Sequence, residues 1–260
     1  MGFVRIKAPI LTMQRHRFFA PPGHILASAI FLDPEESHHL VRVLRLLPGA
    51  IVYSFDGNGS EYECEVTRAS KDRAELNIRA RLSNEVESPL QLTLGQSLVK
   101  GDKFDWIVQK ATELGVTRVV PLLTEHSEFK KAEGRELRLQ RWRRIALEAT
   151  KQCGRRQLIE IGEILSFEQF CATNTDELRL IFSERKGGNL AEMHGAKSLS
   201  IAIGPEGGWS EQELLEAETS GFVPIHLGNR ILRTETAAVS AVTIAQYLFG
   251  DLGWSKAINA

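Results

Sequence analysis

The chain has 260 residues, of which 43% are hydrophobic and 25% charged, as in a folded protein with a substantial core. Its formal net charge is −1, so the overall charge does not point to nucleic acid, and only a local basic cluster could. Cys64, Cys153 and Cys171 lie far apart without metal-ligand spacing, which indicates reduced thiols in a cytoplasmic protein. No apolar run reaches the roughly 20 residues that cross a membrane. Residues 1–12 do not resemble a secretory signal and are expected to matter little.

The residues up to 85 are predicted to be rich in strands. Candidate strands are His24–Leu32, Ile51–Phe55, Tyr62–Arg68 and Arg73–Leu82. One helix, capped by Asp33, is expected to interrupt them. The apolar side of this helix would carry Leu40, Val43, Leu44 and Leu47. We expect the strands to close into a small β-barrel or a curled sheet.

The polar segment Ser83–Pro89 breaks this pattern, so we expect a domain boundary between residues 85 and 86. Beyond it, strands alternate with helices. The candidate strands are Leu90–Leu98, Val116–Leu123, Leu158–Ile161, Leu178–Phe182, Leu199–Ile203 and Pro224–Leu227. The candidate helices are Asp102–Leu114, Arg135–Gln152, Ser210–Ser220 and Glu235–Phe249. This alternation predicts an α/β domain with a mostly parallel sheet covered by helices.

Two of these strands end in turns rich in glycine or polar residues. Residues 204–208 are Gly-Pro-Glu-Gly-Gly, and residues 227–237 are Leu-Gly-Asn-Arg-Ile-Leu-Arg-Thr-Glu-Thr-Ala. Ligands of open α/β sheets bind at the carboxyl ends of strands, and glycine lets the backbone approach them closely. The two turns therefore predict one shared pocket. Taken alone, the first turn could be a tight connection without a ligand, but the second carries two arginines, a carboxylate and two hydroxyls that a plain connection does not need.

Further motifs accompany the two turns. They are His38–Arg45, Lys110–Val116 and the series Trp142, Glu148, Gln152, Gly154 and Arg155. Together with the turns they closely resemble the RsmE family, the small-subunit ribosomal RNA uridine-N3 methyltransferases of the SPOUT superfamily. The resemblance extends from about Arg17 to Gly250.

The resemblance implies both an architecture and an activity. It implies a PUA-like RNA-binding domain at residues 1–85 and a SPOUT domain with a deep trefoil knot at residues 86–260. The SPOUT domain would bind S-adenosylmethionine and form a homodimer. The implied reaction is methylation of N3 of one uridine in 16S ribosomal RNA, giving 3-methyluridine. The RNA or the 30S subunit would be the partner, and neither a metal nor a membrane would be needed.

The resemblance also implies which residues hold the methyl donor. They come from the two turns and from the end of one further strand. The implied set is Ser183, Glu184, Ile203, Gly204, Pro205, Gly207, Gly208, Leu227, Gly228, Ile231, Leu232, Thr236 and Ala237.

The implied reaction needs a group that stabilises negative charge and a group that accepts a proton. When N3 loses its proton, charge spreads onto O2 and O4, and Arg233, or secondly Arg230, is predicted to stabilise it. Glu206 or Glu235 could accept the proton. Glu235 could instead be a helix-start carboxylate paired with an arginine. Arg17 could reach RNA in the pocket of a partner subunit, or be a surface arginine on an edge strand.

Basic side chains gather on two of the predicted helices. The predicted RNA contacts are Arg42, Arg45, Arg138, Arg141, Arg144 and Arg155. A solvated helix face is the alternative. The last helix, Glu235–Phe249, is apolar almost all round, which is typical of deep core or of half a dimer interface.

Two other functions stay open from the sequence. One is a SPOUT enzyme that methylates the ribose 2′-hydroxyl or another base of RNA. The other is a non-catalytic RNA-binding protein, which would keep the basic helix and the first domain without needing the two glycine turns.

Overall fold

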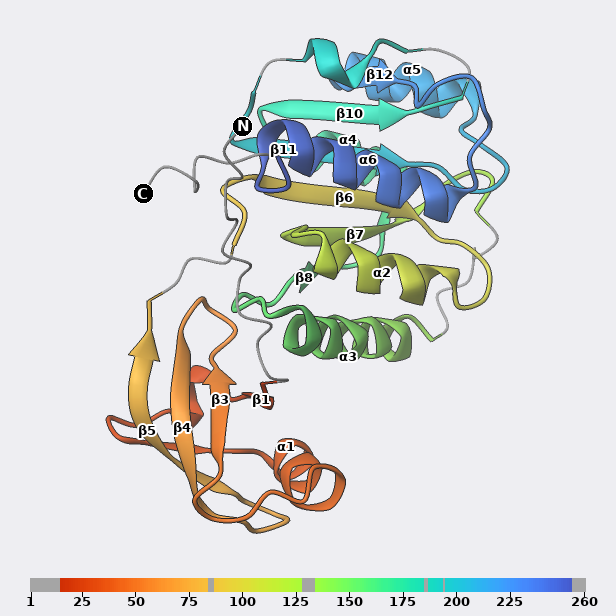
Figure 1. Cartoon of the computed structure of the whole chain (residues 1–260). Helices are drawn as coiled ribbons and strands as arrows, with labels where there is room; N and C mark the ends of the chain where they lie inside the picture. Colours follow the sequence, from red (N-terminus) through yellow and green to blue (C-terminus); the bar gives the residue numbers. More distant parts are fainter. Residues whose placement is uncertain (1–14, 84–86, 128–133, 185–186, 194, 254–260) are drawn as a thin grey trace, which may run out of the picture. The chain divides into compact units, whose positions relative to one another are not determined.

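The computed structural model describes residues 15–83, 87–127, 134–184, 187–193 and 195–253 (Figure 1). Residues 1–12, which were expected to matter little, lie outside these ranges. The chain divides into two compact units, Met1–Glu85 and Val86–Ala260. Each unit has its own buried apolar core, which is one cluster in the first unit and two in the second.

The first unit is built mainly from five strands. Its elements are β1 (Arg17–Phe19), η1 (Pro22–His24), β2 (Ala29–Phe31), α1 (Pro34–His38), η2 (His39–Val43), β3 (Ile51–Phe55), β4 (Glu61–Arg68) and β5 (Glu75–Leu82). The sheet order is β1-β3-β4-β5-β2, in which β1 runs parallel to β3 and the other pairs are antiparallel. The described strands thus form a sheet with β1 and β2 at its two edges, and within the described residues β1 and β2 do not pair to close it into the barrel that was one of the two expected forms.

Two expectations for the first unit are wrong in detail. Asp33 does cap α1, because its carboxylate accepts from the backbone N–H of Glu36 over 2.8 Å. After α1, however, the chain continues as the π-helical turn η2. A π-turn does not keep the 3.6-residue spacing, and Val43 and Leu47 are 63% and 72% exposed while Leu40 is buried. The expected strand His24–Leu32 is also reduced to β2 by the turn η1 at its start.

The second unit is an α/β structure. Its elements are β6 (Gln91–Ser97), α2 (Lys103–Glu113), β7 (Arg118–Leu123), α3 (Arg135–Cys153), β8 (Glu160–Ile161), β9 (Leu165–Ser166), α4 (Phe167–Thr173), β10 (Leu178–Phe182), η3 (Leu190–Glu192), β11 (Ser198–Ile203), α5 (Glu211–Thr219), β12 (Val223–Ile225) and α6 (Thr234–Phe249). The order β12-β10-β11-β6-β7-β8 is parallel throughout, and β9 also pairs with β7. The mostly parallel sheet is thereby confirmed, whereas β9 and α4 were not anticipated.

Helices cover both faces of this sheet. Successive side chains of a strand point to opposite faces, so β7, β10 and β11 each contribute to two separate clusters. Leu94 and Ile201 belong to the cluster that includes buried residues of α2, α3 and α6. Val120 and Ala202 belong to a second cluster with residues of α4 and α5. Figure 1 shows α2 and α6 crossing in front of the strands. The central strands are therefore apolar on both sides, as buried parallel strands are.

The last helix, α6, is hydrogen-bonded to residues near the beginning of the second unit. Gln246 of α6 is fully buried, accepts from Ser88 Oγ over 2.7 Å and donates to the carbonyl of Gly115 over 3.1 Å. Only one side of α6 is buried in the chain. Ile244 and Leu248 on its other side are 36% and 38% exposed.

Candidate functional site

Three loops of the second unit enclose one cavity. They follow β10, β11 and β12, whose carboxyl ends lie together because these strands are neighbours and parallel. The cavity measures about 400 Å³, a size usual for small-molecule sites. Its walls are Phe182–Glu184, Ile203–Trp209, Ile225, Leu227, Gly228, Arg230–Thr234 and Ala237. The turns at residues 204–208 and 227–237 thus line the same cavity, as the sequence predicted.

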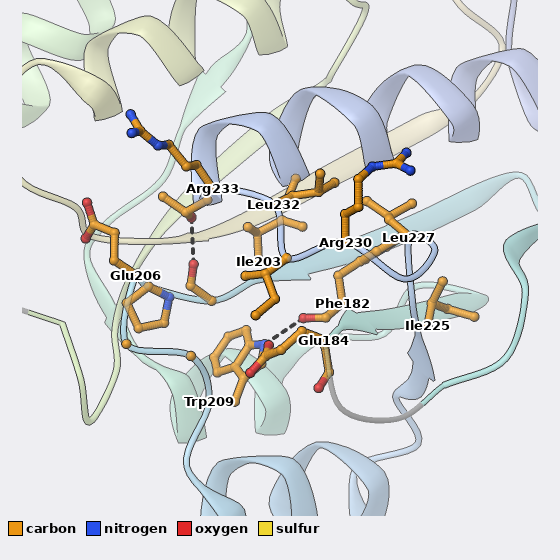
Figure 2. A pocket seen from close by; sticks show the side chains of 18 of the residues that line it. Phe182, Glu184, Ile203, Glu206, Trp209, Ile225, Leu227, Arg230, Leu232 and Arg233 are labelled. Carbon is orange, nitrogen blue, oxygen red and sulfur yellow. Dashed lines mark hydrogen bonds between the residues drawn. The ribbon is translucent and has the colours of Figure 1, made fainter.

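The glycine-rich turn after β11 is packed tightly on a tryptophan. Trp209 donates its Nε1–H to the carbonyl of Phe182 over 2.9 Å, which links this turn to the end of β10 (Figure 2). A Cβ on Gly204 would lie only 3.1 Å from the Trp209 ring. Gly208 has a φ of 73°, which favours glycine. His126, from the loop after β7, contacts the carbonyl of Gly208 through Nδ1 at 3.0 Å.

The start of α6 closes the cavity from another side. Thr234 Oγ1 donates to the carbonyl of Gly204 over 2.6 Å and accepts from the buried Gln96 Nε2 over 3.2 Å. Thr234 and Ala237 both line the cavity, since residues three apart share a helix face. Glu235 and Thr236 do not line it. Their expected direct contact with the cofactor or substrate is therefore not supported by the structure.

Charged side chains stand at two sides of the cavity. Figure 2 shows Arg233 and Glu206 on one side and Arg230 on the other. Lys103, at the start of α2, donates to Glu206 Oε1 over 2.6 Å and lies 3.9 Å from Glu235 Oε2. The hydrogen bond with Glu206 raises the pKa of Lys103, and the charges of Glu206 and Glu235 add to this effect. Lys103 therefore stays an ammonium at neutral pH.

Most of the predicted site residues line the cavity. Those that do are Ser183, Glu184, Ile203, Gly204, Pro205, Glu206, Gly207, Gly208, Leu227, Gly228, Arg230, Ile231, Leu232, Arg233 and Ala237. Four other lining residues were not named individually as site residues from the sequence, which are Phe182, Trp209, Ile225 and Thr234. Phe182 and Ile225 are the last residues of β10 and β12, so the ends of the two strands were the available signal. No motif pointed to Lys103.

Two of the arginines predicted to have functional roles are buried and ion-paired. Arg17 is 8% exposed, donates to Glu61 Oε1 over 2.7 Å and lies over the ring of Phe55. Arg155 is 5% exposed and donates to Glu87 Oε2 over 2.9 Å and to two backbone carbonyls. Removing either partner of such a buried pair would leave an uncompensated charge in the core. Arg17 is therefore not a surface arginine, and the guanidinium group of Arg155 is buried in the second unit.

The other predicted RNA contacts are accessible to different degrees. Arg42 and Arg45 are exposed in the first unit, and Arg45 has a φ of 53°, which is uncommon outside glycine. On α3, Arg144 is exposed and Arg138 is half-buried. Arg141 is exposed but donates to Asp105 and Asp102 over 2.8 and 3.1 Å.

The described ranges contain neither a candidate membrane span nor a candidate metal site. In that part of the chain, no helix combines the length and apolarity that a membrane span requires. The same ranges contain no group of three or more His, Cys, Asp or Glu side chains suited to hold a metal ion.

Comparisons with known proteins agree with this geometry. A family model described as "RNA methyltransferase domain" matches residues 86–246, and one described as "RNA methyltransferase PUA domain" matches residues 32–79. The fold and its cavity thus define the class of RNA methyltransferases with a PUA domain.

Individual relatives narrow the class. Ribosomal RNA small subunit methyltransferase E of Buchnera aphidicola is 33% identical over 224 residues, covering 85% of this chain and 88% of the relative. The enzyme of the same name from Neisseria gonorrhoeae, solved bound to S-adenosyl methionine, is 34% identical with a TM-score of 0.86, covering 92% of this chain and 100% of that one. A methyltransferase from Legionella pneumophila, solved with the same cofactor, has a TM-score of 0.87 at 32% identity, with coverages of 92% and 100%. The chain belongs to the family of ribosomal RNA small subunit methyltransferase E.

Proposed function

We propose that the protein transfers a methyl group from S-adenosylmethionine to N3 of a specific uridine in 16S ribosomal RNA, giving 3-methyluridine. The observation that carries the proposal is the convergence of the loops after β10, β11 and β12 on one cavity, with Arg233 and Glu206 at its rim. Family membership and the cofactor-bound relatives support the same activity.

The cavity fits a cofactor with an adenine ring and a charged tail. Ile203, Leu227 and Leu232 provide apolar surface for the ring, and Ile231 lines the cavity although it is 85% exposed. An exposed apolar side chain at the mouth of a cavity is a place where a planar base could pack. The backbone of residues 204–208 would hold the cofactor's polar groups, because glycines leave it accessible. When bound, the cofactor supplies an electrophilic methyl group, and its sulfur takes up the electrons of the broken carbon–sulfur bond.

The chain's own residues would prepare the uracil for this transfer. Arg233 would stabilise the negative charge on O2 and O4, with Arg230 as the second candidate. Glu206 lines the cavity and Glu235 does not, so Glu206 is the better candidate for accepting the N3 proton. The proton would then pass to water.

RNA would be held by both units. The match to an RNA methyltransferase PUA domain supports a binding role for the first unit, with Arg42 and Arg45 as contacts. On α3 we retain Arg138, Arg141 and Arg144 as candidates for phosphate contacts. Either 16S RNA or the 30S subunit could be the substrate.

Three further features belong to the proposal. The exposed apolar side of α6, with Ile244, Tyr247 and Leu248, supports a homodimer. The chain passes from β12, at the edge of the sheet, to α6, which packs on β11. Membership of the family supports a deep trefoil knot around the loops of the cavity. We also propose a cytoplasmic location, where the small ribosomal subunit is found.

Nucleoside mass spectrometry tests the proposed reaction. Purified protein is incubated with labelled S-adenosylmethionine and small subunits or 16S RNA from cells that lack the protein. The expected product is 3-methyluridine at one site. A 2′-O-methylated nucleoside or a different methylated base would indicate another RNA methyltransferase of the superfamily. If no methylated nucleoside formed and calorimetry detected no binding of S-adenosylmethionine, the non-catalytic RNA-binding function would replace the proposal.

A further inference from the structure

Lys103 lies outside the cavity and connects two carboxylates near the rim of the cavity, those of Glu206 and Glu235. Lys103 begins α2, Glu206 belongs to the turn after β11, and Glu235 lies in the first turn of α6. The distances from Lys103 Nζ are 2.6 Å to Glu206 Oε1 and 3.9 Å to Glu235 Oε2. Segments that are about 100 residues apart in the sequence therefore meet at this one ammonium group.

The two carboxylates stand in different surroundings. Glu206 lines the cavity, and its side chain is 37% exposed. The side chain of Glu235 is 19% exposed, and its Oε2 is buried without a hydrogen-bond donor among the described residues. A buried carboxylate oxygen of this kind is costly unless a positive charge lies close to it. Lys103 is that charge, and Glu235 in return limits where the lysine can move.

We infer that Lys103 is a positioning residue for proton removal from the substrate, and that it orients the Glu206 carboxylate through a Glu235–Lys103–Glu206 chain. The inference rests on the proposed function. Catalytic bases are commonly oriented by a second charged group that does not itself touch the substrate. Lys103 does not line the cavity, so it acts through Glu206.

The step is a simple proton transfer. The N3–H bond of the uracil breaks, its proton moves to Glu206 Oε2, and its electron pair remains on N3. Because Oε1 is held by Lys103, the other oxygen is left to face the substrate. The hydrogen bond with Glu206 and the charges of Glu206 and Glu235 raise the pKa of Lys103, against the opposing effects of desolvation and of the charge of Arg233. Lys103 therefore remains a cation throughout the step.

The test compares Lys103→Met, which keeps the length of the side chain, with Lys103→Arg, which keeps its charge. At neutral pH we expect Lys103→Met to slow single-turnover methylation roughly 10- to 100-fold. Its affinity for S-adenosylmethionine, measured by calorimetry, should stay within about threefold of the wild type. Lys103→Arg should keep most of the rate.

The pH profile separates positioning from a merely structural role. At alkaline pH the uracil N3 ionises without a base, so the defect of Lys103→Met should shrink as pH rises. Glu235→Gln should give a weaker defect with the same trend. Lys197→Met, which changes an exposed lysine before β11, is the matched control and should leave the rate unchanged at every pH.

A double-mutant cycle gives a readout that does not depend on activity. Lys103→Met, Glu206→Gln and the double variant are compared by chemical unfolding, and the two changes should be non-additive. The inference is overturned if Lys103→Met is as fast as the wild type, if its defect is equal at all pH values, or if the changes are additive. If the wild type binds the cofactor but forms no 3-methyluridine, the proposed function fails and the inference fails with it.

Discussion

The hydroxyl of Thr234 donates to the carbonyl of Gly204 over 2.6 Å and so fixes the start of α6 against the glycine-rich turn. Because both residues line the cavity, the bond sets the shape of the cofactor pocket. Thr234→Val should weaken binding of S-adenosylmethionine by about 1–2 kcal/mol, or roughly 5- to 30-fold, since the carbonyl loses its donor. Thr234→Ser keeps the hydroxyl and should bind nearly as well as the wild type. Calorimetry measures both, and equal affinities for the two variants would contradict this role.

Arg233→Ala should separate turnover from cofactor binding. Its guanidinium is predicted to stabilise the anionic uracil, and loss of one such group costs roughly 100- to 1,000-fold in rate. The affinity for S-adenosylmethionine should change little. Arg230→Ala, on the other side of the cavity, is the matched comparison and should be less damaging. Rapid-quench single-turnover assays with 30S subunits measure both rates, and normal methylation by Arg233→Ala would remove this residue from the mechanism.

Phosphate contacts of α3 should appear in the salt dependence of RNA binding. Replacing Arg141 and Arg144 by Gln should weaken binding and lower the slope of log affinity against log salt by about 1 to 2. Arg141 also pairs with Asp102 and Asp105, so we expect the slope to fall by the smaller of these two amounts. Arg118→Gln, which changes an exposed arginine on β7, serves as control. A slope identical to that of the wild type would mean that this face of α3 meets only water.

Thiol chemistry tests the packing of both units. Burial raises the pKa of Cys64 and of Cys171 from 9.0 to about 12, whereas Cys153 is exposed. At pH 8 one thiol per native chain should react quickly with a thiol reagent, and all three should react after unfolding. If two or three thiols of the native protein reacted quickly, the core around Cys64 or Cys171 would be accessible to the reagent.

The same pKa shifts predict how stability changes in alkali. An unfolded chain releases these two protons near pH 9, whereas the folded chain holds them to about pH 12. Above pH 9 the unfolded state therefore binds fewer protons, and the free energy of unfolding falls as pH rises. Urea unfolding at pH 8 and pH 10 measures the fall. Replacing Cys64 and Cys171 by Ala should reduce it.

The sequence was a good guide where one local signal decides the structure. The strands of the second unit and the cap at Asp33 follow from apolar runs and from one carboxylate. Prediction from the sequence failed where contacts between residues distant in the sequence decide the local structure. The π-turn after α1 changes the side-chain spacing, which exposes Val43 and Leu47.

The same distinction holds for the site. Motifs named most residues of the cavity, because the turns after β11 and β12 contain them. They could not reveal Lys103, whose position depends on α2 lying beside two distant segments. They also could not show that Arg17 and Arg155 are buried against Glu61 and Glu87, because burial is not visible from charge and spacing.

The bonds of Gln246 have a consequence for the newly synthesised chain. This side chain reaches back to Ser88 and Gly115, at the beginning of the α/β unit, and α6 completes the core against the sheet. While residue 246 is still inside the ribosomal exit tunnel, the emerged part of this unit has an uncovered apolar face. The first unit can fold early, whereas the methyltransferase unit must wait for its last helix, and it is exposed to chaperones until α6 has left the tunnel.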